Sequence, residues 1–325
     1  MVVFQAGTLF LLVFPSGYNF GHPLFTLFIN DLPQCINDQC LLFADDLKVF
    51  REITCVDDCL SLQSDLQKIN SWCNTWHLFL NLKKCSILTV TLKKQPCMFE
   101  YSICNDVLER VNVQKDLGIF IDTKLTFVHH VDSLIKKASR LTGLVWRNFR
   151  SCSSERILRT LYCSIVRPHL EFCTVAFNSI SKSQSDRLER VQRRYLYFMF
   201  RTLHNNNNLN LGNPSYTELC ELYNLPSLLQ RRTVNDCLFL YKHIHNVFNL
   251  TDANPYQLHV PTHRTRAAVN HVLHVPWSRV EVTKRGFISR IASTYNRLHG
   301  TCDVFGARSV NIFRREIYKG LVLNG

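Results

Sequence analysis

The amino-acid sequence predicts an α+β protein, with strands concentrated in residues 1–128 and helices after them. Up to about residue 122, short apolar runs are separated by turn signals, and one long amphipathic helix interrupts them. Regular strand–helix–strand alternation is missing there, which favours a largely antiparallel sheet. From residue 130 onward, apolar residues recur at helical spacing. Hydrophobic residues make up 46% of the 325, which excludes a disordered chain.

The clearest strand signal surrounds two adjacent acidic residues. Apolar residues at 40–43 and 47–50 flank Ala44-Asp45-Asp46, and this pattern predicts a β-hairpin with both carboxylates at its tip. An amphipathic helix is expected over 56–78, with acidic residues in its first turn. Further strands are expected at 87–90, 99–103, 107–111 and 117–122, the middle two joined as a hairpin through Cys104-Asn105-Asp106.

The remaining elements are predicted helices. We expect them at 131–145, 157–165, 185–201, 216–223 and 226–247. Pro168 should end the second helix, and Pro226 suits the first turn of the last. The asparagine run at 205–208 predicts a linker. The expected domains are therefore 1–128, 129–204 and 214–325, with a linker at 205–213.

Charge is unevenly distributed along the chain. Residues 1–130 contain 10 Lys and Arg against 13 Asp and Glu, a net charge of −3, whereas residues 131–325 contain 28 against 12, a net charge of +16. A long region of one sign attracts a phosphate backbone. The alternative is a soluble protein whose helices carry basic, solvated faces.

The sequence shows no sign of membrane insertion or secretion. No apolar run reaches the roughly 18–20 residues that a membrane-spanning helix needs. The apolar N-terminus lacks a basic start, and Pro15-Ser16-Gly17 makes a poor cleavage site. The 14 cysteines include no CxxC pair, which argues against a zinc site and fits free thiols in a reducing, intracellular compartment.

Two features could carry chemistry. Adjacent carboxylates at a hairpin tip repel each other, so Asp45 and Asp46 point to a bound divalent cation such as Mg²⁺, whereas an ordinary polar turn with two solvated aspartates is the alternative. A basic stripe occupies one face of the helix at 185–201, with apolar residues on the adjoining face, and it could bind phosphates or be merely solvated. The stripe consists of Arg187, Arg190, Arg194 and Arg201, and a second basic patch contains Lys136, Lys137, Arg140, Arg147 and Arg150.

A set of motifs in one order resembles the reverse transcriptases of jockey-like non-LTR retrotransposons. Phe43-Ala44-Asp45-Asp46 is similar to the x-A-D-D box of that family. The segments at 21–33, 72–85, 115–130, 161–171 and 231–242 resemble, in order, the motifs that precede and follow this box. The resemblance covers about residues 16–300 and implies a polymerase right hand, with a partial palm at 1–128, a helical thumb at 129–204 and a basic C-terminal domain.

The resemblance also implies roles for individual residues. Asp45 and Asp46 would be catalytic ligands of Mg²⁺ or Mn²⁺, and Phe43 would lie against the primer terminus. Lys84 would approach the phosphates of the incoming dNTP, unless it is simply a solvated lysine at the start of a strand. The arginine stripe would follow the template–primer duplex. The implied partners are an RNA template, a DNA primer or target, and dNTPs, in the nucleus or cytoplasm; the oligomeric state is not indicated.

The sequence departs from this family at its N-terminal side. A two-metal polymerase needs a further aspartate upstream of the hairpin, and residues 1–15 contain neither Asp nor Glu. The family's S-G-V-P-Q-G loop is incomplete, because Ser16-Gly17 is followed directly by Tyr18. We therefore expect an N-terminally truncated reverse transcriptase that is inactive by itself. The alternative is a catalytically dead remnant that binds nucleic acid without being an enzyme.

Overall fold

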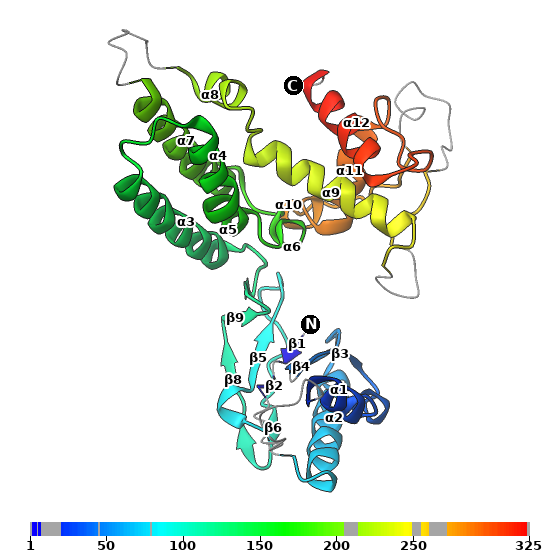
Figure 1. Cartoon of the computed structure of the whole chain (residues 1–325). Helices are drawn as coiled ribbons and strands as arrows, with labels where there is room; N and C mark the ends of the chain where they lie inside the picture. The colour runs from blue at the N-terminus through cyan, green and yellow to red at the C-terminus, as the bar shows by residue number, and fades with distance from the viewer. Residues whose placement is uncertain are drawn as a thin grey trace. The chain divides into compact units, whose positions relative to one another are not determined.

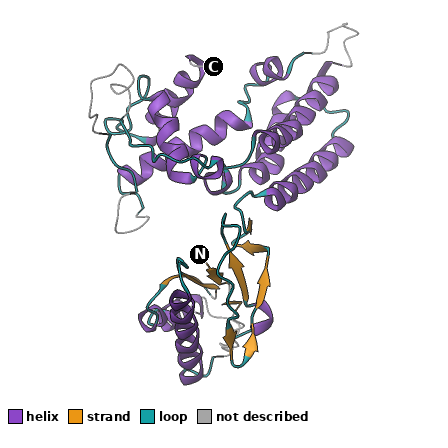
Figure 2. Cartoon of the chain, turned by 180° about the vertical axis from the view of Figure 1, so that it is seen from behind, coloured by secondary structure: helices purple, strands orange, loops and turns teal. Residues whose placement is uncertain are grey.

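The computed structural model describes residues 2–4, 6–7, 21–44, 46–78, 80–204, 214–248, 255–259 and 272–323. The chain forms two compact units, Met1–Leu125 and Thr126–Gly325 (Figure 1). Among the described residues, every β-strand belongs to the first unit, and the second unit is built of helices with one isolated β-bridge (Figure 2). The α+β prediction is confirmed. The predicted linker residues 205–208 and the incomplete loop at Ser16 lie outside the described residues.

The core of the first unit lies between a hairpin and one long helix. The hairpin consists of β3 (Gln39–Phe43) and β4 (Asp46–Phe50), and the helix is α2 (Val56–Thr75). Leu47 and Val49 of β4 are buried in one cluster with the apolar side of α2. The segment before the hairpin forms α1 (Gly21–Ile29) and the short 3₁₀ turn η1 (Leu32–Cys35), in which Pro33 suits an N-terminal position.

Short strands complete the first unit in four small sheets. The hairpin sheet has the order β2-β4-β3, where β2 is Ala6–Gly7. A second sheet has the order β1-β5-β8, and its β5–β8 pair is parallel, a local exception to the predicted antiparallel pattern. The β6–β7 hairpin follows the predicted turn at Cys104-Asn105-Asp106. The β9–β10 hairpin turns at Leu117 and Gly118, so the prediction of a strand beginning at residue 117 was wrong there. The bounds are β1 (Val2–Phe4), β5 (Ser86–Thr89), β6 (Ser102–Ile103), β7 (Asp106–Val107), β8 (Glu109–Val111), β9 (Val113–Asp116) and β10 (Ile119–Asp122).

The second unit starts with α3 (Val128–Asn148), which lies side by side with α7 (Lys182–His204) (Figure 1). Between them in sequence come α4 (Glu155–Leu161), the π-helical turn η3 (Tyr162–Val166), α5 (Arg167–Glu171) and α6 (Thr174–Phe177). The prediction that Pro168 ends a helix was wrong. Pro168 stands in the first turn of α5, where its missing N–H is tolerated, and the π-helical turn joins α5 to α4 without a break.

The last two helices of the chain pack against α9 (Leu228–Ile244). Its N-cap is Ser227, which forms a capping box with Gln230, so Pro226 precedes the helix and is not in its first turn as predicted. The other helices are α8 (Tyr216–Leu222), α10 (Glu281–Lys284), α11 (Phe287–Leu298) and α12 (Val310–Leu323). No helix in the described part of the chain is long and apolar enough to cross a membrane.

Candidate functional site

The β3–β4 hairpin places Asp46 at its turn. Phe43 and Asp46 are the last paired residues of the two antiparallel strands, and Ala44 follows Phe43 directly. Ala44 has a φ of 51°, the left-handed backbone that tight hairpin turns require. The hairpin is thus confirmed at the predicted position, while Asp45 itself lies outside the described residues. Asp46 begins β4, the central strand of its sheet.

The Asp46 side chain is half-buried and unengaged. Within the described residues it makes neither an ion pair nor a hydrogen bond. Because side chains alternate along a strand, Lys48 projects from the same face of β4. Lys48 forms an ion pair with Asp116 of β9, with 2.6 Å between Lys48 Nζ and Asp116 Oδ1, and both side chains are largely buried. The Asp46 carboxylate is therefore not engaged by any group among the described residues.

The donor chemistry around the hairpin suits Mg²⁺, but the number of ligands is small. A carboxylate is the hard oxygen donor that Mg²⁺ prefers, and this ion commonly takes only one or two carboxylates together with water and substrate phosphates. In the part of the chain that is described, no three His, Cys, Asp or Glu residues lie close enough together to hold a metal. Asp46 with its neighbour Asp45 can supply two of the required oxygens, and further ligands must come from elsewhere.

The two other residues predicted at this site are accessible. Phe43 is 62% exposed at the end of β3. Lys84 is exposed in the 3₁₀ turn η2 (Leu82–Lys84), and this turn contacts β2. Since Gly7 of β2 pairs with Asp46, the turn that carries Lys84 lies beside the strand next to the acidic pair. The position of η2 is compatible with the predicted role of Lys84.

The start of the hairpin is held by a buried acidic residue that the sequence analysis missed. Asp65 of α2 is completely buried, and its carboxylate accepts the backbone N–H groups of Asn37 and Asp38 at 3.0 and 2.8 Å. Lys68 approaches the same carboxylate at 2.8 Å. Asn37 and Asp38 immediately precede β3, so Asp65 fixes where the hairpin begins. An acidic residue within the apolar repeat Leu62, Leu66 and Ile69 was the available signal.

The far end of the hairpin is tied to the start of α2. Arg51, just after β4, forms ion pairs with Asp38 and Asp58. Asp58 closes the N-terminus of α2, and the Thr54 hydroxyl together with the backbone N–H groups of Thr54 and Cys55 holds the pKa of this carboxyl well below its ordinary value. Both ends of the hairpin are thus anchored to one helix, which leaves the turn as its free end.

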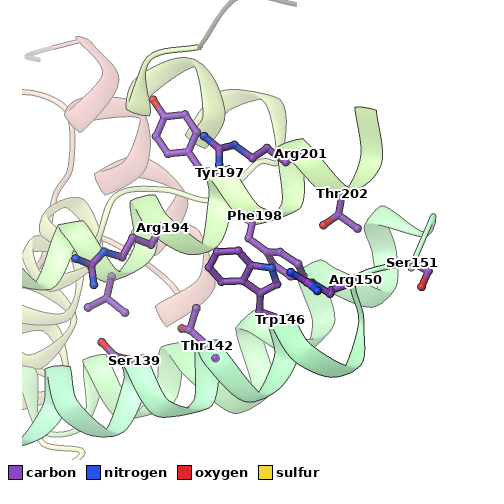
Figure 3. A pocket seen from close by; sticks show the side chains of 12 residues that line it. Ser139, Thr142, Trp146, Arg150, Ser151, Arg194, Tyr197, Phe198, Arg201 and Thr202 are labelled. Carbon is purple, nitrogen blue, oxygen red and sulfur yellow. The ribbon is translucent and has the colours of Figure 1, made fainter. Parts of the chain in front are cut away.

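The structure divides the predicted arginine stripe of α7. Arg187 is neutralised by Asp132 of α3 at 2.6 Å. Arg190 lines a hollow of about 460 Å³ together with Asp186 and Glu189. Arg194 and Arg201 line a larger pocket of about 980 Å³ between α3 and α7 (Figure 3). The stripe therefore contains two arginines with acidic neighbours and two that face an open pocket.

One arginine of the second predicted patch joins this pocket. Arg150 follows α3 and lines the pocket with Arg194 and Arg201 (Figure 3). The three arginines are exposed, and within the described residues none forms an ion pair. Among the described residues, those that line the pocket include no Asp or Glu. The remaining members of the second patch are exposed on α3, namely Lys136, Lys137, Arg140 and Arg147.

A buried polar network fixes the opposite side of α7. Gln192 is completely buried, accepts the Tyr162 hydroxyl at 2.6 Å and donates to the Tyr216 hydroxyl and the Pro226 carbonyl, both at 3.0 Å. Burial raises the pKa of Tyr162 well above its ordinary value, so this hydroxyl stays a donor. Groups from three other segments thus bond to α7 on the side away from its arginines.

Comparison with known proteins finds similarity to RNA-directed DNA polymerases. Residues 5–132 match the family described as "Reverse transcriptase (RNA-dependent DNA polymerase)". The chain is 26% identical over 196 residues to the RNA-directed DNA polymerase from mobile element jockey of Drosophila funebris, covering 56% of this chain and 21% of that protein. It is 28% identical over 216 residues to the probable RNA-directed DNA polymerase from transposon BS of Drosophila melanogaster, covering 60% and 24%.

A third relative is the probable RNA-directed DNA polymerase from transposon X-element of Drosophila melanogaster, 26% identical over 191 residues, which covers 55% of this chain and 21% of that protein. The chain thus matches less than a quarter of the length of each of these relatives. No solved structure is detectably similar to it.

Proposed function

Because this chain is a relative of the jockey-like reverse transcriptases, with the family match at residues 5–132, we propose that it supplies the metal-binding hairpin and the duplex-binding helices of an RNA-directed DNA polymerase. The single observation that carries the proposal is the antiparallel β3–β4 hairpin, at whose turn Asp46 has no ion pair or hydrogen bond with the described residues. In this proposal residues 1–128 are a partial palm, residues 129–204 a thumb and residues 214–325 a basic C-terminal domain acting in the nucleus or cytoplasm.

In the palm, Asp45 and Asp46 would hold Mg²⁺ or Mn²⁺. The chemistry supplied by bound ions is charge stabilisation at the oxygens exchanged when a dNTP is joined to a primer. The protein's own contribution is positioning: Asp65 and Arg51 fix the two ends of the hairpin, so its carboxylates meet the reacting phosphates at a defined place. Exposed Phe43 would contact the primer terminus, and Lys84 the triphosphate.

In the thumb, the template–primer duplex would lie along α3 and α7. Arg194, Arg201 and Arg150 are the strongest candidates for phosphate contacts, because within the described residues no carboxylate neutralises them. Arg190 and Arg187 belong to the same stripe but have acidic neighbours, so we assign them smaller contributions. The net charge of +16 over residues 131–325 supports this surface as the side that attracts nucleic acid.

We further propose that the 325-residue chain does not extend primers by itself. The first Asp or Glu of the sequence is Asp31, so residues 1–30 offer no additional carboxylate to the hairpin. Positioned metal ions supply almost all of the catalysis in phosphoryl transfer, so an incomplete ligand set removes most of the rate. This reasoning also supports a second function, a non-enzymatic nucleic-acid-binding protein, because the free arginines of the pocket do not depend on the metal site.

Primer extension combined with binding tests the proposal. The purified chain is incubated with a primed RNA template, dNTPs and Mg²⁺ or Mn²⁺, beside an Asp45→Ala/Asp46→Ala variant. We expect both proteins to bind the RNA–DNA hybrid equally and neither to extend the primer. Extension by the unaltered chain that disappears in the variant would show that its ligand set is complete. Absence of hybrid binding at low salt would refute both functions.

A further inference from the structure

The pocket between α3 and α7 contains an accessible aromatic ring as well as cations (Figure 3). Trp146, near the end of α3, is 48% exposed although it is the largest apolar side chain of this surface. Its indole packs against buried Phe198 of α7, with ring centroids 5.8 Å apart and planes inclined by 36°. Phe198 therefore supports the indole from the protein side, and the remainder of the indole is open to a ligand.

The charge of the pocket selects an anionic ligand. Its described lining includes Arg150, Arg194 and Arg201 and no acidic residue. Three like charges around one hollow repel one another until an anion enters. The smaller hollow on the same helix provides the contrast, because Asp186 and Glu189 there balance two arginines. Both hollows lie on α7, so the difference in charge belongs to this pocket and not to the helix as a whole.

A nucleotide unit combines the two properties that this pocket would recognise, a flat aromatic base and adjacent phosphates. An aromatic side chain beside arginines is the arrangement that proteins use to bind single strands, since every base has a face on which to stack. In a duplex, base faces are already stacked and paired, so an indole in a pocket cannot reach them. The volume of about 980 Å³ is at the upper end for small-ligand pockets and accommodates a base with its sugar and phosphate.

We propose that this pocket binds an unpaired nucleotide of a single-stranded nucleic acid, with the base stacked on Trp146 and the flanking phosphates on Arg150, Arg194 and Arg201. The inference rests on the proposed function in nucleic-acid binding and adds the form of the strand that this surface recognises. Template next to the copied duplex is single-stranded and would be its natural source. The arginines serve duplex and single strand alike, whereas Trp146 distinguishes between them.

Gly143 offers a way to close the pocket without changing its charge. It lines the pocket in the C-terminal half of α3, and an added Cβ would meet the guanidinium of Arg147 at 3.6 Å, an ordinary contact. A side chain added at this position therefore starts beside the pocket without a backbone clash at its Cβ. Since glycine is a poor helix former, Gly143→Leu should also preserve or increase the stability of α3.

The test compares two probes on the full chain at one fixed salt concentration. Fluorescence anisotropy measures the Kd for a labelled oligouridylate of about 12 nucleotides, a length within the usual range of single-strand sites, and for a duplex of equal length. The variants are Trp146→Ala, Gly143→Leu and, as matched control, Trp277→Ala. Trp277 is 78% exposed and lies 5.4 Å from the Arg279 guanidinium, so it is a second exposed indole beside an arginine but outside the pocket. Circular dichroism and thermal melting check that each variant is folded.

We expect Trp146→Ala and Gly143→Leu each to weaken oligouridylate binding on the order of tenfold to a hundredfold. For Trp146→Ala, the Kd for duplex should change less than about twofold. Trp277→Ala should leave both constants unchanged. Equal oligouridylate affinity in the unaltered chain and in Trp146→Ala would overturn the inference, and so would an equal loss for both probes. Failure of the unaltered chain to bind either probe would instead refute the proposed function on which the inference rests.

Discussion

Replacing Asp65 tests how the structure positions the acidic hairpin. The Asp65 carboxylate accepts two backbone N–H groups, from Asn37 and Asp38, in a completely buried position. Hydrogen bonds to a charged acceptor contribute about 1.5–3 kcal/mol each, and a buried donor left without an acceptor loses its share in full. We therefore expect Asp65→Ala to lower the free energy of unfolding of the first unit by about 3–5 kcal/mol.

Two further variants separate the possible causes. Asp65→Asn keeps one oxygen that can accept both N–H groups but loses the charge, so about 1–2 kcal/mol is expected. Lys68→Ala removes only the ion pair, and because the Lys68 side chain is 36% exposed, the loss should stay below about 1 kcal/mol. The predicted order of destabilisation is thus Asp65→Ala, then Asp65→Asn, then Lys68→Ala.

Urea unfolding followed by tryptophan fluorescence gives the measurement. In a Trp146→Phe/Trp277→Phe background, the remaining indoles, Trp72 and Trp76, both lie in the first unit, so the signal reports on that unit alone. If Lys68→Ala costs as much as Asp65→Ala, the ion pair and not the backbone acceptor holds the hairpin. A loss below about 1 kcal/mol for Asp65→Ala would refute the reasoning.

Two other changes should alter stability in defined directions. Burial against Phe177 lowers the pKa of His130 from its ordinary 6.5, so the folded chain binds fewer protons than the unfolded chain, and stability should fall as the pH drops below about 6.5. His130→Leu should flatten this dependence in urea titrations at pH 7 and pH 5. Lys48→Met leaves the mostly buried Asp116 without its partner and should cost about 2–3 kcal/mol in urea unfolding, less than for a completely buried pair. Lys48→Met/Asp116→Leu should recover most of that loss. If the double variant is as unstable as Lys48→Met, the loss does not arise from leaving Asp116 without its partner.

The helices and the main hairpin could be predicted because local patterns determine them. The apolar repeat of α2 and the turn between β3 and β4 are properties of neighbouring residues, and both elements occur where the sequence predicts them. The parallel β5–β8 pair and the continuation of the chain through Pro168 were missed. The first depends on a pairing between distant segments, and the second on a π-helical turn that no spacing rule indicates.

The candidate site was predictable in composition but not in arrangement. The sequence motifs single out Asp46 and the arginines of α7, but helical spacing alone groups Arg187, Arg190, Arg194 and Arg201 into one surface. Helical periodicity places residues on a face without showing what a neighbouring helix brings to it. Asp132 neutralises Arg187, while Arg150 and Trp146 turn the outer half of the stripe into a pocket. These contacts come from α3 and the residues just after it, so only the packing of two helices reveals them.

The salt dependence of binding to an RNA–DNA hybrid tests the central claim most directly. The claim is that the free arginines of the α3–α7 pocket contact phosphates, and each neutralised phosphate contributes about −0.9 to the slope of log K against log salt. We predict a steep slope for the unaltered chain that becomes shallower by roughly 2–3 in Arg150→Gln/Arg194→Gln/Arg201→Gln, and a nearly unchanged slope for Arg187→Gln, because Asp132 already neutralises that side chain. A flat salt response, or the same slope in the triple variant as in the unaltered chain, would contradict the account.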